Sequence, residues 1–180
     1  MGVTEQHLTI NELEAGLDEI RQAPRDRGVL RLIVRRPKAN AREVLEEGHL
    51  DPARGLVGDT WETRGRPAHP DNQLNIMNAR AIALVAQSPD RWALAGDQLF
   101  IDLDLSADNL PPGARFTLGS AVIEVTEQPH TGCAKFAARF GIDAVKFVNS
   151  PEGKLLRLRG LNAKVVVPGV IRVGDVATKL

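Results

Sequence analysis

The sequence lacks several residue types and patterns that mark particular protein classes. Its 180 residues include one cysteine, no tyrosine and only 4% aromatic residues. A single thiol cannot form a disulfide within the chain, and it has no second cysteine for a zinc ribbon or a Cys-x-x-Cys redox pair. Cationic and anionic side chains balance at 23 each. This balance argues against general nucleic-acid binding and against a polybasic membrane surface.

Long apolar runs and nucleotide-binding motifs are missing as well. No stretch approaches the ~20 apolar residues that a membrane span requires. The N-terminus has neither the basic segment nor the apolar segment of a signal peptide. The sequence contains no G-x-G-x-x-G, Walker A or G-x-S-x-G pattern. We therefore expect a cytoplasmic protein with a reduced thiol, without nucleic-acid or membrane partners.

The patterns that are present favour a mainly β fold with short helices. Apolar residues make up 43% of the chain, and 16 glycines and 11 prolines punctuate it. Short strands separated by such turn residues are typical of a closed or partly closed barrel. Apolar alternation or short apolar runs predict strands at 29–35, 98–105, 121–126, 155–158, 164–167 and 170–173.

Helical spacing appears between these strands. Residues 9–22 read as an amphipathic helix with a capping box, and we expect a helical appendage over 1–27 ahead of a barrel domain over 28–180. Other predicted helices are 41–47 capped by Asn40, 77–86 capped by Asn78, and the pair 134–140 and 142–149. Residues 51–75 show little periodicity, which predicts a functional or mobile loop.

The lone cysteine, Cys133, lies in the segment Pro-His-Thr-Gly-Cys-Ala-Lys-Phe. If 134–140 is helical, Cys133 stands at its N-terminus, where free amides and the helix dipole favour a thiolate. Lys135 and Arg139 would add positive charge. Cys133 also shares a helical face with Phe136 and Phe140, so it could instead be a packing residue. Residue chemistry alone leaves both interpretations open.

Three residues upstream, His130 could act as a base for the thiol, as in a Cys-His nucleophile. A single histidine in a loop is also commonly a surface or hydrogen-bonding residue. Cys133 and His130 alone cannot complete a zinc site, and no third ligand follows at a regular spacing. A Cys-His hydrolase or transferase is therefore a further hypothesis.

Cations near predicted turns suggest an anion site. The bend Arg159-Gly-Leu-Asn162-Ala-Lys164 could hold an anion such as phosphate, and Arg80 is a further candidate. Taken singly, each could be a solvated surface charge. The pair Asp102 and Asp104 is interpreted as solvent-facing and not as an acid-base dyad.

Two stretches together resemble a known family. Residues 96–126 contain an Asn109-Leu110 pair and a glycine-led strand, and 130–136 place the cysteine before a short helix. With Gly174-Asp175 in a terminal strand, these features resemble the MOSC domain, the C-terminal domain of molybdenum cofactor sulfurases, in its stand-alone bacterial form. The resemblance covers about residues 55–176. Thr131-Gly132 stands where a proline-containing run is more usual.

The resemblance implies a β-barrel that binds the pterin-based molybdenum cofactor or carries sulfur for it. Cys133 would be the metal ligand or sulfur carrier, and Asn109 a pocket residue. The further predicted cofactor contacts are Thr131, Gly132, Arg80, Arg159, Asn162 and Lys164. The implied activity is an oxidoreductase that reduces N-hydroxylated small molecules, or cofactor sulfuration. Electrons or sulfur would come from a separate donor protein, and pyridoxal phosphate is not expected in this chain.

An alternative from a different class also fits the sequence. The chain could be a non-catalytic β-barrel module that binds a small anionic ligand or a partner protein. In that case Cys133 would serve only as a packing residue. Whether the sulfur opens onto a basic cavity or is enclosed by hydrocarbon discriminates between the two.

Overall fold

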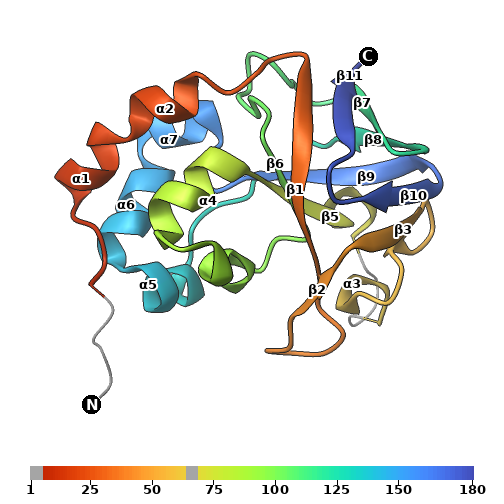
Figure 1. Cartoon of the computed structure of the whole chain (residues 1–180), viewed down its shortest axis with the longest axis horizontal. Coiled ribbons are helices and arrows are strands. Elements are labelled where there is room, and N and C mark those ends of the chain that lie inside the picture. Colours follow the sequence, from red (N-terminus) through yellow and green to blue (C-terminus); the bar gives the residue numbers. More distant parts are fainter. Residues whose placement is uncertain (1–5, 64–68) are drawn as a thin grey trace.

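A closed barrel forms one half of the molecule (Figure 1). The structure is a computed structural model that describes residues 6–63 and 69–180. Within these residues, seven strands follow the order β11-β7-β8-β9-β5-β6-β1, and β1 closes the ring by pairing with β11. Only the neighbours β5 and β6 are parallel, so the barrel is mixed. The predicted mainly β, barrel-like fold with short helices is confirmed.

The barrel strands are short, as the turn-rich sequence predicts. They are β1 (Arg27–Arg35), β5 (Leu74–Asn78), β6 (Leu99–Ile101), β7 (Arg115–Leu118), β8 (Ala121–Val125), β9 (Leu161–Val167) and β11 (Val176–Lys179). Strand β2 (Glu43–Leu45) extends the sheet from β1. A second small sheet contains β10 (Gly169–Arg172), β3 (Glu47–Asp51) and β4 (Gly55–Leu56).

Alternation along the strands divides the buried residues between two cores. Ile76 and Leu99 point into the barrel, whereas their neighbours Met77 and Phe100 point out of it. Successive strand residues face opposite sides of a sheet, so a strand buried on both faces supports a core on each. The outward-facing residues pack against the helices and thereby fix the helical layer to the barrel wall.

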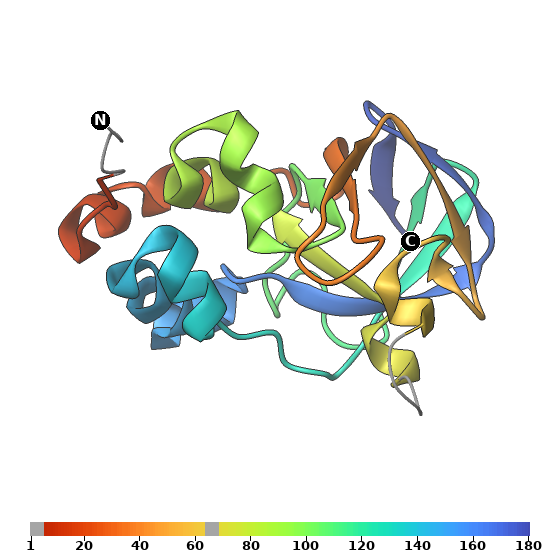
Figure 2. The same ribbon diagram turned by 90° about the horizontal axis from the view of Figure 1, so that it is seen from below.

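That helical layer covers one side of the barrel, as two perpendicular views show (Figures 1 and 2). Its α-helices are α1 (Ile10–Ala15), α2 (Leu17–Arg21), α4 (Ala79–Ala86), α5 (Ala134–Phe140), α6 (Ile142–Asn149) and α7 (Pro151–Leu156). The 3-10 helix η2 (Pro89–Ala95) joins them, while α3 (Thr60–Thr63) and the 3-10 helix η1 (Pro70–Asn72) lie elsewhere. No helix in the described ranges has the length and apolar character needed to cross a membrane.

The predicted N-terminal helix is present but broken. The capping box between Thr9 and Glu12 forms as expected. Gly16 ends α1 and precedes α2, so residues 9–22 form two short helices and not one. Leu13 and Ile20 are buried in the core that α4, α5 and α6 share. These helices therefore pack on the helical layer, while a domain boundary at residue 27 stays a prediction.

Two predicted elements are wrong. Residues 41–47 are not a polar helix, because Val44 pairs with Val34 and the segment becomes β2 and the start of β3. Tertiary pairing overrides weak local propensity here. Residues 155–158 are not a strand, because α7 extends to Leu156. Its start is stabilised by Ser150, whose hydroxyl accepts a hydrogen bond from the Gly153 amide.

Other local predictions are confirmed or refined. Asn78 caps α4, and α5 and α6 have the predicted bounds, separated by Gly141 at φ 95°. β6 is shorter than the predicted strand 98–105, yet Leu103 and Leu105 are fully buried as expected. The predicted loop 51–75 contains short elements, and residues 64–68 of it lie outside the described residues.

Candidate functional site

The segment between β8 and α5 carries the lone cysteine. Cys133 occupies the N-cap position of α5, and its side chain is exposed. The hypothesis that Cys133 only fills a core is therefore wrong. Phe136 and Phe140 on the same helix are buried, so the apolar face of α5 begins after the cysteine. Burial of these two rings fixes the helix and leaves the thiol at its open end.

The surroundings of Cys133 favour its charged form. Its pKa is lowered mainly by the backbone amide of Phe136, with further contributions from the Lys135 amide and from the charges of Arg159 and Lys135. Partial burial opposes this shift without cancelling it. The amides of Lys135 and Phe136 belong to the first turn of α5, where backbone N–H groups favour negative charge on the sulfur. A thiolate at this position is both a nucleophile and a soft metal ligand.

The thiol opens onto a large cleft, which we call the basic cleft. It has a volume of about 700 Å³. Six cationic side chains line it together with His130 and Cys133: Arg36, Lys38, Arg42, Lys135, Arg139 and Arg159. Among the described residues, no aspartate or glutamate contributes to the lining. A cleft of this charge concentrates anions.

Two of the six cations are neutralised by buried carboxylates. Arg36 binds Asp59 in a bidentate manner, with Nε 3.0 Å from Oδ1 and Nη2 2.8 Å from Oδ2. Burial alone would raise the pKa of Asp59, but Arg36 outweighs it and the pKa is lowered. Arg159 donates from Nη1 to Asp97 Oδ1 at 2.5 Å. These two pairs form the inner wall of the basic cleft.

The other four cations have no such partner. Within the described ranges, Lys38, Arg42, Lys135 and Arg139 form no salt bridge, and we call these four side chains the cationic rim. Arg42 donates to the carbonyl of Ala93, and burial together with the neighbouring charges of Arg139 and Arg36 lowers its pKa. Lys38 and Lys135 are exposed to solvent, so their charge is available to an anion that enters the cleft.

His130 belongs to the inner wall. Its Nε2 lies 3.2 Å from Asp97 Oδ2, while Arg159 holds the other oxygen of the same carboxylate. Asp97 is fully buried. Burial would raise the pKa of Asp97, but the charges and hydrogen bonds of Arg159 and His130 outweigh it and the pKa is lowered. Gly160, at φ 117°, permits this arrangement, since a Cβ there would approach both Asp97 and His130.

The described contacts include no hydrogen bond between His130 and Cys133. Nε2 of His130 faces Asp97 instead. A Cys-His nucleophile depends on a direct thiol-imidazole contact or one close to it. The structure therefore does not support the Cys-His hydrolase hypothesis, although both side chains line the basic cleft.

Two asparagine side chains hold the segment that precedes the cysteine. Asn149 accepts from the Gly132 amide at 2.8 Å and donates to the Gly132 carbonyl at 3.1 Å. Asn162 donates to the carbonyls of Gln128 and Pro129 at 3.0 and 3.2 Å. With Asp97 holding His130, the segment is fixed at three points. Such preorganisation reduces the cost of positioning a ligand at the thiol.

The predicted cofactor contacts fall into two groups. Arg159 lines the basic cleft, Gly132 adjoins Cys133, and Asn162 supports the same segment from behind. Thr131 is exposed beside them. The cleft lining does not include the other three predicted contacts among the described residues: Arg80, Asn109 and Lys164.

Each of those three side chains has partners elsewhere. Arg80 pairs with Asp102 at 2.8 Å, which leaves that aspartate only partly exposed and not free in solvent. Asn109 is buried and accepts from Lys179. Lys164 lies opposite Glu124 across the β8-β9 ladder, with Nζ and a carboxylate oxygen 3.5 Å apart. Their roles as cofactor contacts remain predictions without support from this geometry.

Sequence reasoning did not identify several residues of this site. Lys38 and Arg42 reach the cleft because they lie on the loop that joins β1 to β2, and Arg42 falls within the segment 41–47 that was expected to be a helix. Asp97 and Asn149 are single polar residues beside a turn and at a helix end. Asp97 contacts His130 and Arg159, which lie 33 and 62 residues further along the chain, and Asn149 contacts Gly132, which lies 17 residues before it. Nothing in the sequence links these residues.

Comparison with known proteins identifies the family. A sequence profile of the MOSC domain matches residues 64–178, which is more than half of the chain. The protein therefore belongs to the MOSC domain family. No curated protein matches the sequence.

Solved structures share the fold at low sequence identity. YuaD from Bacillus subtilis is 15% identical with a TM-score of 0.57, and the match covers 84% of this chain and 96% of that one. YiiM from Escherichia coli is 22% identical with a TM-score of 0.55, covering 84% and 69%. YiiM from Geobacillus stearothermophilus is 14% identical with a TM-score of 0.53, covering 85% and 73%. These similarities support the fold. The function has to be inferred from the side chains of the site.

Proposed function

We propose that this MOSC protein binds the pterin-based molybdenum cofactor in the basic cleft, with the Cys133 thiolate as a metal ligand. The observation that carries the proposal is the position of an exposed thiol of lowered pKa in a cleft with four unpaired cations. Thiolate sulfur is a soft donor, which suits molybdenum, and guanidinium and ammonium groups suit the phosphate of the pterin.

The cleft residues fit such a ligand. A volume of about 700 Å³ lies within the range of cofactor sites. Arg36 and Arg159 are held in fixed orientations by buried carboxylates and would bind an anion without losing much side-chain freedom. The cationic rim would neutralise the remaining negative charge. Asn75, whose side chain donates to Asn162, adds a polar group to the lining.

The activity we infer is reduction of N-hydroxylated compounds. In that reaction an N–O bond breaks, two electrons arrive from a separate donor protein, and two protons are taken up to give N–H and water. When bound, the cofactor would supply the redox chemistry. Nε2 of His130 lies next to Asp97, so Nδ1 is the ring nitrogen that this carboxylate leaves free. Asp97 and Arg159 would keep the ring in that orientation.

Metal analysis tests the proposal. The wild-type protein and the variant Cys133→Ser are produced in a host that makes the cofactor, and the molybdenum content per chain is measured. We expect the wild type to retain molybdenum and Cys133→Ser to lose most of it. Lys146→Met on the exposed face of α6 is the control and should retain metal like the wild type. Equal retention by wild type and Cys133→Ser would remove the ligand role of the thiol.

A second candidate function is sulfur carriage, favoured by the exposure of Cys133. In this reaction the thiolate attacks the outer sulfur of a persulfide donor. A new S–S bond forms at Cys133, the S–S bond of the donor breaks, and the donor leaves as a thiolate. A mass increase of one sulfur atom on the wild type after incubation with a persulfide, absent in Cys133→Ser, would support it. The chain would then deliver sulfur and need not retain molybdenum.

A further inference from the structure

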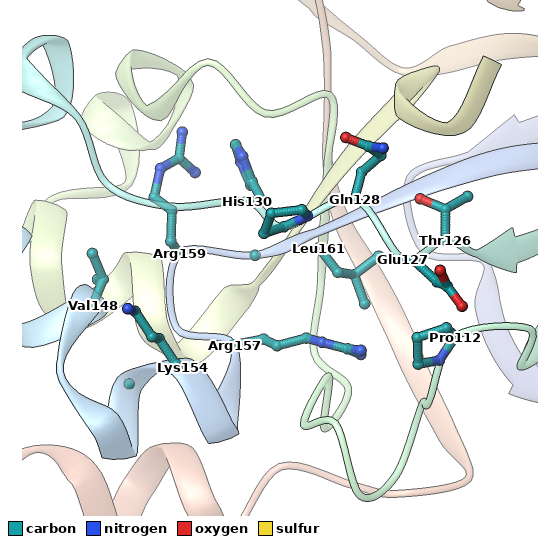
Figure 3. A pocket seen from close by; sticks show the side chains of 13 residues that line it. Pro112, Thr126, Glu127, Gln128, His130, Val148, Lys154, Arg157, Arg159 and Leu161 are labelled. Atoms are coloured by element: carbon teal, nitrogen blue, oxygen red, sulfur yellow. The ribbon is translucent and has the colours of Figure 1, made fainter. Parts of the chain in front are cut away.

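A second, smaller cavity lies beside the basic cleft and shares two residues with it. Its volume is about 130 Å³. His130 and Arg159 line both cavities, so they form the wall between them. Figure 3 shows Lys154 and Arg157 along one side of the small cavity, with Gln128 and His130 along the other. Lys154 belongs to α7, and Arg157 follows that helix.

The cavity is basic. Lys154 and Arg157 form no salt bridge within the described ranges. Arg157 is anchored by donating to the carbonyls of Leu105 and Leu110, so its position is fixed without its charge being neutralised. One carboxylate, Glu127, lies near Pro112 and Thr126, at the end opposite Lys154 in Figure 3. The half of the cavity near Lys154 and Arg159 therefore has no acidic lining residue among the described residues.

The shared wall carries an unsatisfied donor. Arg159 is 7% exposed, and its Nε has no hydrogen-bond partner among the described residues. Its two terminal nitrogens are occupied by Asp97 and by the carbonyl of Ala95. A buried donor without a partner costs about 1–3 kcal/mol, and this one lies in the wall that the two cavities share.

We propose that the small cavity binds a small oxyanion of phosphate, sulfate or carboxylate type between Lys154, Arg157 and Arg159. Its volume of about 130 Å³ leaves room for a small tetrahedral oxyanion. Lys154 and Arg157 would hold the anion by charge-assisted hydrogen bonds, and the charge of Arg159, whose terminal nitrogens are bound to Asp97 and Ala95, would attract it. The small cavity shares His130 and Arg159 with the basic cleft, but this proposal does not rest on cofactor binding there.

Phosphate titration of the cofactor-free protein tests this site. Inorganic phosphate, and sulfate in parallel, is added to the variant Cys133→Ser, and the arginine side-chain Nε–H resonances are followed by NMR. We expect saturable shifts of the Arg157 and Arg159 signals. Lys154 is exposed and its replacement by Met should preserve the fold while weakening phosphate binding about tenfold, or about 1.4 kcal/mol.

Further variants make the result decisive. Arg157→Lys keeps the charge but loses the anchored guanidinium, and it should also weaken binding if the protein stays folded. Lys146→Met removes an exposed cation of α6 that lines neither cavity, and it should leave phosphate binding unchanged. Absence of saturable shifts would overturn the proposal. So would loss of binding in Lys135→Met with none in Lys154→Met, because the anion would then lie in the basic cleft.

The same titration on cofactor-loaded protein identifies the source of the anion. If the loaded protein still binds phosphate at Arg157, the site takes a free oxyanion. If the Arg157 signal is already shifted before phosphate is added, the phosphate of the cofactor occupies the site. Both results support the site. Failure of the protein to retain molybdenum would refute the proposed function and leave this titration unaffected.

Discussion

The inner wall and the cationic rim of the basic cleft carry the same kind of side chain in opposite electrostatic states. In the inner wall, Arg36 and Arg159 are neutralised by Asp59 and Asp97, two fully or nearly fully buried carboxylates. In the rim, Lys38, Arg42, Lys135 and Arg139 have no salt-bridge partner among the described residues. The wall is therefore part of the folded framework, whereas the rim charges are not neutralised by any carboxylate of the described residues. The predictions below test this division.

Loss of a wall carboxylate should have the largest effect. Asp97→Ala leaves the guanidinium of Arg159 buried without its counter-charge and releases His130. We expect the free energy of unfolding to fall by about 3–5 kcal/mol, the usual cost of breaking a buried pair from one side. Urea denaturation measures it. Glu152→Gln, which breaks the exposed pair with Arg21, is the control and should change stability little. An Asp97→Ala variant as stable as this control would contradict the division.

The wall should also make stability depend on pH in the acidic range. The pKa values of Asp59 and Asp97 are lowered in the folded state, so the unfolded chain binds more protons when the pH falls. Their contribution is complete above about pH 5, and it is lost as the pH drops below ~3.9 towards the lowered folded values. Denaturation curves at several pH values should show that the free energy of unfolding falls less steeply with decreasing pH for Asp97→Asn than for the wild type. The same pH dependence in both proteins would show that protonation of Asp97 does not contribute to it.

The asparagine that holds Gly132 should have an intermediate effect. Asn149→Leu removes both hydrogen bonds to the Gly132 backbone, and we expect a loss of about 1–2 kcal/mol. Asn149→Asp keeps the acceptor for the Gly132 amide and should lose less. Thermal unfolding orders the two variants. A wild-type melting temperature in Asn149→Leu would mean that water replaces both bonds and that the thiol segment is held elsewhere.

Changes in the cationic rim should alter stability least and ligand binding most. Lys135→Met removes an exposed, unpaired charge, so the free energy of unfolding should stay within about 0.5 kcal/mol of the wild type. The pKa of Cys133 should rise, because Lys135 contributes to lowering it. The rate of thiol alkylation as a function of pH reports this shift. If Lys135→Met left the pH profile of alkylation unchanged and greatly lowered the free energy of unfolding, Lys135 would be a structural residue like those of the inner wall.

Local signals in the sequence predicted much of the fold. The capping box at Thr9, the cap at Asn78 and the glycine between 134–140 and 142–149 act within a few residues, and each gives the structure it predicts. The position of Cys133 at a helix start follows from the same signals. The segment 41–47 fails because its strand identity comes from pairing with β1, which local propensity does not contain.

The site was predictable only where a local pattern marks its residues. Cys133, His130 and Arg159 were identified, but the carboxylates that define the wall were not, because Asp97 and Asp59 lie 62 and 23 residues from their arginines in the sequence. Conversely, Arg80 and Lys164 resembled free cations. Their partners, Asp102 and Glu124, come from neighbouring strands and are visible only once the register is known. Charge alone therefore indicated a basic site without showing which cations form it.

Alkylation of Cys133 before and after cofactor loading tests the central claim most directly. In the cofactor-free protein, we expect the thiol to react rapidly near neutral pH, since it is exposed and its pKa is lowered. In protein loaded with the molybdenum cofactor, the reaction should be strongly suppressed, and it should return when the metal is removed. A loaded protein that is alkylated at the cofactor-free rate and keeps its molybdenum would show that the metal is bound without this sulfur.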